Sequence, residues 1–494
     1  MATINMNGMT IKKEINFGEW YVELLKKCKL ISYTDISGCY VLLPNSYSIW
    51  ENIVKALDLE LKKVDVQNSY FPLFITQQNL KKEQDHVEGF APEVAIVTKT
   101  GNTDLDPDNY LIIRPTSETT IYATYKTLIH SYRDLPLKYN QYCNVVRWEF
   151  KDTMPFIRSR EFLWSETHNC FANKIEATND VDLMINLYSK IYSETLAIPT
   201  IMGTKTNLEK FNGSVLSKTL ECIIPNVVKG VQACTSHYLG NIFSKAFDIS
   251  FRSASNDVEF VHQTCHGFTT RSIGIMLLTH SDNKGLVLPP YVAKTQVVII
   301  PILQKESQQL VMNYIYNINE LLIAANIRTS IDVNEFETMG FKCNKHELGG
   351  IPVRLEIGMR DVENNEIVLF RRDTCTKQKI KTVNVVDSVL KTFTDINNNL
   401  FDKASNLLKS NINGATNINE FRKNIKSKKI NLINWCNTDN CEKKIKHKFG
   451  VKTFCIIDEN NELNKQILEK NIDVLNCIFC NEPCVVKCLF GKSY

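Results

Sequence analysis

One stretch in the first half of the chain, residues 144–168, concentrates arginine, glutamate and histidine side chains in a strand-like sequence. Residues 145–150 are rich in β-branched and aromatic residues, a charged loop follows, and residues 162–167 form a second such run, which predicts an antiparallel pair of strands. Because side chains alternate along a strand, we expect Arg147 and Glu149 on one face. Guanidinium groups pair phosphate oxygens, so this face suits a nucleoside triphosphate with Mg²⁺. A solvated hairpin of alternating charges is the plainer alternative.

Three other segments place polar side chains at the ends of predicted strands. Residues 111–118 form an apolar strand that ends in hydroxyl side chains and Glu118, which either caps the following helix or captures an ammonium group. Residues 231–240 set polar side chains between apolar flanks, as in a strand that lines a ligand. In residues 264–291, Arg271 stands between a strand and a buried helix, where an arginine can meet a phosphate. Each segment can serve a ligand site, and each could also be scaffold.

The cysteines near the C-terminus are spaced like metal ligands. Cys436 and Cys441 have four residues between them, and Cys477 and Cys480 have two. Two short-spaced pairs separated by a longer loop predict a structural zinc site, in which four thiolates fill the tetrahedron and leave no position for a catalytic water. Three neighbouring cysteines could substitute for one of these ligands: Cys455, Cys484 and Cys488.

Length and composition limit the number of domains and the kinds of partner and location that this chain can have. At 494 residues the chain should form two to four domains. A net charge of +4 does not by itself indicate nucleic-acid binding, so any basic surface must be local. The N-terminus lacks the apolar segment of a secretory signal, and no apolar run is long enough to span a bilayer. We therefore expect a cytoplasmic protein without membrane contact, whose 16 cysteines are thiols or metal ligands rather than disulfides.

The elements that must position these residues change in character along the chain. Helical spacing predicts helices over residues 46–61 and 177–196, and residues 64–73 look like a strand. After Pro289 and Pro290, strand-like and helical segments alternate over about 100 residues, and this pattern predicts a separate α/β domain. Clustered charges in that domain, among them Glu347, Arg354 and Arg360, suit the reading of nucleotide bases or form a solvated face.

Six sequence motifs follow one another in the order known from one family. They are RPTSET at 114–119, NVVRWEF at 144–150, PFIRSREFLWSETH at 155–168, TSH with LG at 235–240, TTRSIG at 269–274 and GLVLPP at 285–290. In these motifs, and over essentially its whole length, the chain resembles the prolyl-tRNA synthetases of eukaryotes and archaea, which are class II aminoacyl-tRNA synthetases.

The resemblance implies an architecture of three domains. An α+β catalytic domain with an antiparallel six-stranded sheet and flanking helices would occupy residues 1–290. An α/β anticodon-binding domain would occupy residues 291–395, and a small α+β zinc-binding domain residues 396–494. Residues 46–72 resemble the segment that forms the homodimer interface in the family.

The resemblance also implies an activity and its residues. L-Proline attacks the α-phosphate of ATP to give prolyl-adenylate and pyrophosphate, and the prolyl group then passes to tRNA(Pro) with release of AMP. Arg147, Arg158 and Arg271 would be catalytic. ATP would contact Arg147, Glu149, Arg158, Gln232, Thr235, Thr270 and Arg271. The proline pocket would contain Thr116, Glu118, Arg147, Trp164, Glu166, His168, Phe211 and His237. Glu347, Arg354 and Arg360 would bind the anticodon, with ATP, Mg²⁺ and structural Zn²⁺ as cofactors.

The chain departs from the family pattern at a few positions. Cys265 and His266 stand where a small residue and a tryptophan are expected, so the wall of the pocket should differ. Gly213 is followed by Ser-Val instead of a glycine and an acid, and the second cysteine pair is one residue wider than in many relatives. Only 98 residues separate His168 from Gly267 (267 − 168 − 1), too few for the editing insertion of bacterial relatives. The terminal Tyr494 matches the family, in which it packs toward the active site.

Two kinds of protein are alternatives to this interpretation: another class II synthetase and a non-catalytic relative. A threonyl enzyme would use a catalytic zinc, and the sequence shows no Cys/His/His set around these motifs; a glycyl enzyme is a further class II possibility. A non-catalytic, tRNA-binding relative would be expected to have lost at least one phosphate-binding residue, whereas Arg147, Glu149, Arg158 and Arg271 are all present.

Overall fold

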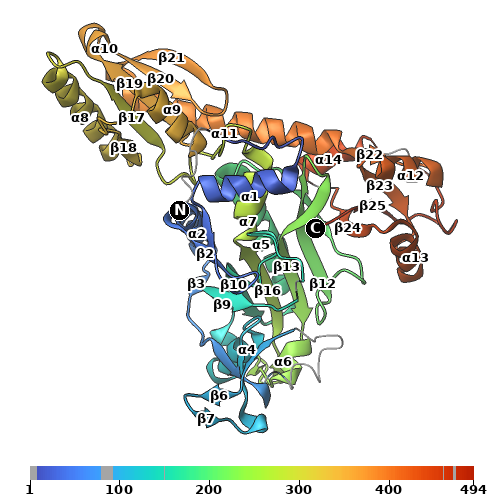
Figure 1. Cartoon of the computed structure of the whole chain (residues 1–494). Helices are drawn as coiled ribbons and strands as arrows, with labels where there is room; N and C mark the ends of the chain where they lie inside the picture. The colour runs from blue at the N-terminus through green and yellow to red at the C-terminus, as the bar shows by residue number, and fades with distance from the viewer. Residues whose placement is uncertain (1–7, 79, 81–92, 150, 460, 471–473) are drawn as a thin grey trace.

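The computed structural model describes residues 8–78, 80, 93–149, 151–459, 461–470 and 474–494. The chain forms a central body and two outlying parts, one within residues 297–381 and the other within residues 412–491 (Figure 1). The long helix α11 (Val385–Ser410) runs across one end of the body and connects them. None of the described helices has the length and apolar character needed to cross a membrane.

Six antiparallel strands form the sheet that carries the site, in the spatial order β11, β12, β13, β16, β10, β9. They are β9 (Leu137–Val146), β10 (Glu161–Phe171), β11 (Ile201–Thr204), β12 (Leu216–Ile224), β13 (Lys229–Gly240) and β16 (His262–Thr269). The short β3 (Gln67–Asn68) lies parallel to β9 at the edge of the sheet. The antiparallel six-stranded sheet expected from the resemblance is therefore present.

The predicted strand pair is present, but its first strand ends early. Val145 pairs with Phe162 and Val146 with Glu161, so β9 stops at Val146 instead of continuing to residue 150. The amide of Arg147 still donates to the carbonyl of Arg160 at 2.7 Å. The next amide, of Trp148, turns away and donates to the carbonyl of Glu93 at 3.0 Å, and this exchange of partners ends the strand.

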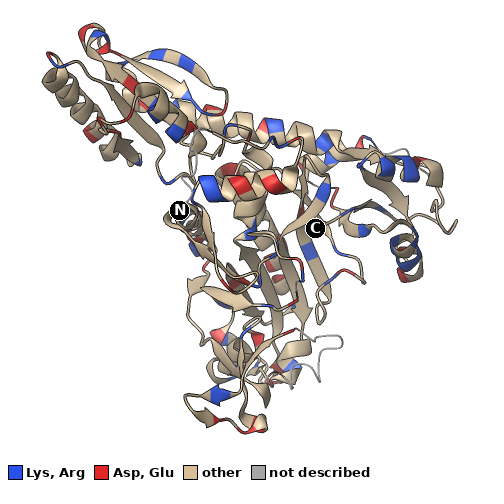
Figure 2. Ribbon diagram, in the orientation of Figure 1, with Lys and Arg blue, Asp and Glu red and all other residues tan. Residues whose placement is uncertain are grey.

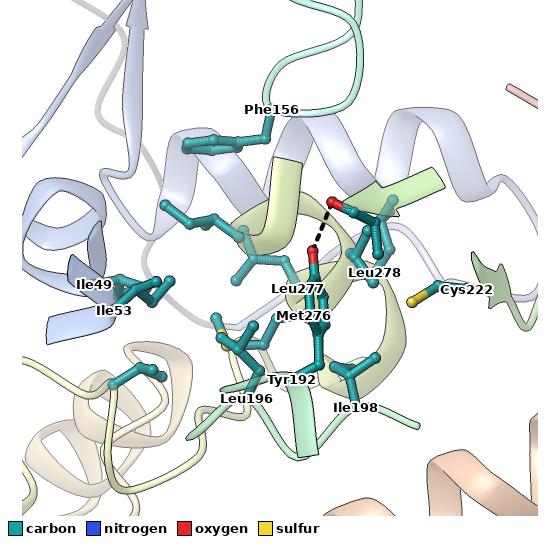
Figure 3. Packing of buried hydrophobic residues seen from close by; sticks show 14 of the residues in the cluster. Ile49, Ile53, Phe156, Tyr192, Leu196, Ile198, Cys222, Met276, Leu277 and Leu278 are labelled. Carbon is teal, nitrogen blue, oxygen red and sulfur yellow. Dashed lines mark hydrogen bonds between the residues drawn. The ribbon is translucent and has the colours of Figure 1, made fainter. Parts of the chain in front are cut away.

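Amphipathic helices cover one face of the sheet and form the largest apolar core. They are α1 (Phe17–Lys27), α2 (Pro44–Lys62), α5 (Lys174–Lys190), followed by a π turn at Ile191–Thr195, and α7 (Arg271–His280). Figure 3 shows Ile49 and Ile53 of α2 and Met276 of α7 near Tyr192, whose hydroxyl donates to the carbonyl of Ala233 at 3.1 Å. The helices predicted over residues 46–61 and 177–196 are confirmed.

Short strands and two helices form the end of the body where β6 and β7 lie (Figure 1). These elements are β4 (Phe74–Thr76), β5 (Ala95–Val97), β6 (Lys99–Thr100), β7 (Thr103–Asp104), β8 (Leu111–Ile113), α4 (Glu118–Leu128), α6 (Ile242–Ala246), β14 (Ser250–Arg252) and β15 (Val258–Phe260). The paired strands β1 (Ile31–Tyr33) and β2 (Tyr40–Leu42) lie nearer α2. The strand expected over residues 64–73 is wrong except at Gln67–Asn68. The amide of Phe71 is bound by the side chain of Gln141 at 3.0 Å, so a backbone ladder cannot continue there.

The part within residues 297–381 is the predicted α/β domain. Its sheet has the order β18 (Thr329–Ile331), β17 (Val297–Ile302), β19 (Val353–Gly358), β20 (Glu366–Arg371), β21 (Thr376–Lys381). β17 is parallel to both β18 and β19, as β-α-β connections require. Helices α8 (Gln308–Ala324), α9 (Met339–Leu348) and α10 (Met359–Asn364) complete the domain.

The C-terminal part extends the catalytic sheet. It contains β22 (Ile412–Gly414), β23 (Ile430–Trp435), β24 (Lys452–Ile457), β25 (Val486–Gly491), α12 (Ile418–Lys426), α13 (Asp439–Phe449) and α14 (Glu462–Leu468). β24 pairs with β11, which makes one continuous sheet of eleven strands. The predicted boundary between residues 395 and 396 falls inside α11, because that helix keeps one apolar stripe, including Phe393, Ile396 and Leu400, along its length.

Candidate active site

A cavity of about 540 Å³ opens on the sheet face formed by β10, β13 and β16. The start of α4 closes one side and the loop at residues 205–212 closes another. Within the cavity wall, side chains two residues apart on β10 point the same way, as strand geometry dictates. All eight residues predicted for a proline pocket line this cavity: Thr116, Glu118, Arg147, Trp164, Glu166, His168, Phe211 and His237.

Two buried carboxylates and an imidazole meet on the cavity floor. Glu118 is the first residue of α4, and Glu166 accepts hydrogen bonds from Ser117 and Gln141. Burial favours a higher pKa for Glu166, but the hydrogen bond and charge of His168 outweigh it and lower the pKa. Burial also opposes charge on His168, yet its hydrogen bond to Glu166 and the charge of Glu118 raise its pKa. The floor thus sets two carboxyl groups against one imidazole, and this excess of acidic groups suits a cationic ligand.

His237 lies on the same sheet face beside this floor, because it pairs with Cys265, which pairs in turn with His168. Its Nδ1 lies 2.7 Å from the hydroxyl of Ser217, and its ring lies 5.2 Å from the ring of Phe211. Burial, with the nearby charges of His266 and Lys205, lowers the pKa of His237 to about 3. The imidazole is therefore neutral at ordinary pH and packs as a polar, uncharged surface.

Arg147 joins the cavity floor to a cationic region. Its Nε donates to the carbonyl of Pro115 at 2.9 Å, and its guanidinium carbon lies 5.2 Å from the centre of the Trp164 ring. These contacts hold the planar group in one orientation at the cavity wall. Arg147 also lines a second, adjoining cavity with Gln232, Thr235 and Arg271.

Arg271 is a half-buried cation of this region. Its Nε donates to the carbonyl of Ile157 at 3.1 Å and its Nη1 to the carbonyl of Gln232 at 3.2 Å. Burial lowers the pKa of Arg271, and the positive charges of Arg147 and Arg158 lower it further. Three arginines that feel one another's charge form a strong field for a polyanion. Arg158 and Arg271 share a third cavity of about 280 Å³.

Comparison with known proteins gives a consistent result along the whole chain. Residues 102–280 match the family model for the class II tRNA synthetase core domain (G, H, P, S and T), residues 296–392 that for an anticodon binding domain, and residues 418–494 that for the C-terminal domain of prolyl-tRNA synthetase. The proline--tRNA ligase, cytoplasmic, of Arabidopsis thaliana is 42% identical over 99% of this chain and 91% of its own. The proline--tRNA ligase of Encephalitozoon cuniculi is 40% identical over 99% of both chains.

The crystal structure of prolyl-tRNA synthetase from Cryptosporidium parvum, complexed with halofuginone and AMPPNP, superposes with a TM-score of 0.91 at 41% identity, and covers 99% of this chain and 100% of that one. The chain belongs to the prolyl-tRNA synthetase family. It is a proline--tRNA ligase, and the predicted ATP-dependent ligation of L-proline to tRNA(Pro) is confirmed. The core family model includes the threonyl and glycyl enzymes, whereas the C-terminal model and these relatives are prolyl enzymes.

In this synthetase one predicted nucleotide-binding residue lies apart from the others. Glu149, Gln232 and Thr235 line the main cavity, whereas Thr270 lines a separate one and precedes α7. Its amide donates to the carbonyl of Leu163 at 3.0 Å, and its side chain is buried. This position gives Thr270 a role in joining α7 to β10, and the prediction of direct ATP contact stays a prediction.

His266 belongs to a polar network that the sequence did not reveal. Its Nε2 lies 2.9 Å from Asp180 Oδ2 and its Nδ1 lies 2.8 Å from the hydroxyl of Ser236. Asp180 also accepts from Thr264 at 2.7 Å and from Asn169 at 2.9 Å. The imidazole of His266 is therefore fixed on the helix-covered face of the sheet by a carboxylate of α5, a long-range partner with no local sequence signal, and Cys265 is the departing residue on the cavity face.

The loop at residues 205–212, which carries Phe211, is held by the C-terminal domain. The hydroxyl of Thr206 donates to Glu442 Oε1 at 3.0 Å, and Lys446 lies 2.6 Å from Glu209 and 2.9 Å from Glu442. Glu442 is completely buried. Helix α13 therefore fixes one wall of the catalytic cavity, although more than 200 residues separate the partners in sequence.

The predicted zinc ligands gather at the start of α13. Cys441 Sγ lies 3.8 Å from Cys477 Sγ, and Cys480 Sγ lies 3.4 Å from Cys436 Sγ. All four sulfur atoms lie within 4.8 Å of one another, close to the spacing of about 3.8 Å in a tetrahedral zinc–thiolate site. The hydrogen bond from Cys441 is the main cause that lowers the pKa of Cys477 to about 4. The alternatives Cys455, Cys484 and Cys488 are not members of this cluster of described residues.

Two of the three predicted anticodon residues meet in the α/β domain. Arg354 Nη1 lies 3.1 Å from Glu347, and its Nη2 lies 2.9 Å from Glu356. The guanidinium stacks 3.9 Å from the centre of the Phe370 ring. Arg360 lies in α10 and is exposed. Sequence reasoning missed Glu356 and Phe370, since their relation to Arg354 depends on pairing between β19 and β20.

Proposed function

We propose that the main cavity binds L-proline on its carboxylate floor and that the adjoining arginine region binds ATP, so that the two meet at Arg147. One observation carries this proposal: eight residues predicted to bind proline surround a single cavity, and Arg147 lines both that cavity and its cationic neighbour. The negative floor at Glu118 and Glu166 suits the ring ammonium of proline. The aromatic walls of Trp164 and Phe211 suit its apolar ring.

The first step needs positioning rather than a covalent nucleophile on the enzyme. A proline carboxylate oxygen attacks the α-phosphorus of ATP, the bond to the bridging oxygen breaks, and pyrophosphate leaves with its electron pair. Arg147 would bind the carboxylate and the α-phosphate together. Arg158 and Arg271 would balance charge on the departing phosphates. Gln232 and Thr235, on the wall shared by both cavities, would orient the nucleotide.

The second step uses the same cavity. A ribose hydroxyl of the terminal adenosine of tRNA(Pro) attacks the prolyl carbonyl, and AMP leaves. The terminal Tyr494 lies close by: its amide donates to the carbonyl of Gly230 at 3.2 Å, and Lys229 Nζ lies 4.7 Å from the centre of its ring. Tyr494 lines the cavity of Arg158 and Arg271, which supports the predicted packing of the C-terminus toward the active site.

Two metal ions fit the residues present. Mg²⁺ usually binds through substrate phosphates and one or two carboxylates, and Glu149 offers a carboxylate on the cavity wall with no ion pair among the described residues. Mg²⁺ would neutralise negative charge on the phosphates of ATP. Zn²⁺ would be held by Cys436, Cys441, Cys477 and Cys480, whose sulfur spacing matches a tetrahedral site. This ion would be structural.

For tRNA, the outer edge of the α/β domain is basic. Lys377, Lys379 and Lys381 alternate along the edge strand β21, and Figure 2 shows the ribbon of this strand with blue segments. Exposed cations attract phosphate and act in concert with base-reading groups such as Arg354, Glu347 and Arg360. We assign anticodon recognition to this domain.

A homodimer formed through α2 and the strands beside it completes the proposal. Tyr47, Leu59, Tyr70 and Phe74 are large apolar side chains left exposed near residues 46–72. Contiguous exposed apolar side chains mark interaction surfaces. Sedimentation should then report two chains per particle, and a monomer at micromolar concentration would overturn this part. We place the enzyme in the cytoplasm, where one relative is named as cytoplasmic.

The decisive experiment is amino-acid-dependent exchange between ATP and pyrophosphate. Exchange with proline should far exceed that with threonine, alanine or glycine. Alanine is the closest competitor, because a pocket rejects a smaller side chain by only about 1–3 kcal/mol per missing methylene. Absence of exchange in folded protein would overturn the assignment of the cavity.

A further inference from the structure

Three side chains with metal-binding atoms converge on the floor of the main cavity. Glu118 begins α4, His168 lies in β10 and Cys265 lies in β16, where it pairs directly with His168 across the two strands. One ligand atom from each residue lies within 4.8 Å of the other two. All three side chains are buried, and all three line the cavity.

The donor set selects a class of ion. A thiolate, an imidazole and a carboxylate together suit Zn²⁺ and its chemical relatives, whereas Mg²⁺ avoids thiolates. A tetrahedral ion sets its ligand atoms roughly 3.3–3.8 Å apart, so each pair here would close by at most about 1.5 Å. Three protein ligands leave a fourth position, which faces the open cavity. This set differs from the closed four-cysteine cluster near the C-terminus.

Neighbouring groups already orient two of the three ligands. His168 Nδ1 lies 3.0 Å from the hydroxyl of Tyr122, a completely buried residue, so Nε2 is the nitrogen for a ligand, and an ion bound there would replace its contact with Glu166 Oε2 at 3.5 Å. Glu118 accepts a hydrogen bond from the hydroxyl of Thr116. Fixed outer contacts of this kind are a usual feature of metal-binding imidazoles and carboxylates.

The thiol of Cys265 is the group that a metal site needs and a proline-binding site does not. Glu118 and His168 are explained by the proposed binding of proline, and two ligands do not hold an ion firmly. Cys265 supplies the third, at a position where the sequence departs from the pattern expected for the family at residues 265–266.

We propose that Glu118, His168 and Cys265 bind Zn²⁺ or a similar thiophilic divalent ion, and that this ion excludes proline and inhibits the enzyme. The inference rests on the proposed assignment of the cavity to proline. The metal ion and the ring ammonium group of proline compete, because both bind the carboxylate of Glu118 and occupy the same space. Zinc then inhibits by raising the proline concentration that is needed, not by altering ATP binding.

Cobalt(II) gives a direct test, because cobalt–thiolate bonds absorb light. The full-length protein is first loaded with Zn²⁺ at the C-terminal cluster, freed of excess zinc and titrated with Co²⁺. We expect a thiolate absorption that proline suppresses in proportion to its concentration. Cys265→Ser should lose the band and weaken binding roughly tenfold or more. Cys375→Ser, which alters an exposed cysteine of the α/β domain, should retain both.

The outcomes separate the two proposals. Equal Co²⁺ binding by wild type and Cys265→Ser overturns the site. Calorimetry of proline without added metal provides the second measurement, and it also checks that Cys265→Ser is folded. If proline binds but the cobalt band persists at saturating proline, the inferred competition is wrong while the proline assignment stands. If proline does not bind at all, the proposed function itself fails.

Discussion

Arg147 illustrates how one side chain is prepared for phosphate chemistry before substrate arrives. The Pro115 carbonyl fixes its Nε, and Trp164 supports its face. A guanidinium held in this way has already lost the rotational freedom that would otherwise oppose binding. Its remaining donors can then act more strongly on charge that develops in the transition state than on the ground state.

Arg147→Ala should lower proline-dependent pyrophosphate exchange by about two to three orders of magnitude, the usual cost of removing one preorganised donor to a developing charge. The melting temperature should stay close to that of wild type. Arg133→Ala is the matched control, since that arginine is exposed and its side chain contacts its neighbour Tyr132. Near-normal exchange in Arg147→Ala would remove Arg147 from the proposed mechanism.

The ion pair of His168 and Glu166 predicts a pH dependence of stability. The raised pKa of His168 means that its charged form stabilises the fold below the unfolded value of about 6.5, and that this contribution is lost as the pH rises through the folded pKa. Glu166, with a lowered pKa, contributes above about 4.5 and loses its contribution as the pH falls. His168→Gln should therefore differ most from wild type between these limits.

Thermal unfolding at several pH values measures this effect. The difference in melting temperature between wild type and His168→Gln should shrink as the pH rises above about 6.5. His130→Gln changes an exposed histidine and should show no such trend. A difference that grows with pH would contradict the ion pair.

At the scale of elements, the sequence predicts best where one strand carries the information. Trp164, Glu166 and His168 alternate along β10, so their shared cavity follows from the pattern itself. The end of β9 and the Asp180–His266 contact were not predictable, because each depends on a partner from a distant segment, as the Trp148–Glu93 hydrogen bond shows. Local patterns specify faces of elements, and distant partners decide where elements stop.

Helix α13 offers a test of positioning from outside the cavity. Lys446→Gln should remove the ion pair that holds Glu209 and so loosen the loop that carries Phe211. We expect KM for proline to rise several-fold with a smaller change in kcat, because a loosened wall weakens binding before it affects the arginines. Lys444→Gln, on the exposed side of the same helix, is the control.

Two results would contradict this role of α13. An unchanged KM in Lys446→Gln would show that the loop keeps its position without the ion pair. Equal effects of Lys446→Gln and Lys444→Gln would show a general effect of charge. Because Glu442 is buried beside Lys446, the melting temperature must be measured with the kinetics, so that loss of folded protein is not mistaken for weaker binding.

At the scale of the whole molecule, the pairing of β24 with β11 ties the C-terminal domain to the catalytic sheet. Cysteine spacing indicated a zinc site and the family resemblance a separate zinc domain, and nothing in either segment specified that it would pair with the catalytic sheet. The core near this junction mixes both parts, with Ile201 and Ile223 beside Phe454 and Leu489. A shared sheet and a shared core make the two domains one cooperative unit.

Removal of metal from the cysteine cluster should therefore destabilise the catalytic domain as well. After chelation, or in Cys477→Ser, calorimetry should show one unfolding transition shifted to lower temperature, and proline-dependent exchange should fall with the folded fraction. The physical reason is that Cys441 lies in the first turn of α13, and the next residue of this helix, Glu442, accepts a hydrogen bond from Thr206 in the cavity loop. Cys375→Ser should change neither measurement. A separate low-temperature transition with full exchange activity would show instead that the C-terminal domain unfolds alone, and that the eleven-stranded sheet does not transmit its stability to the active site.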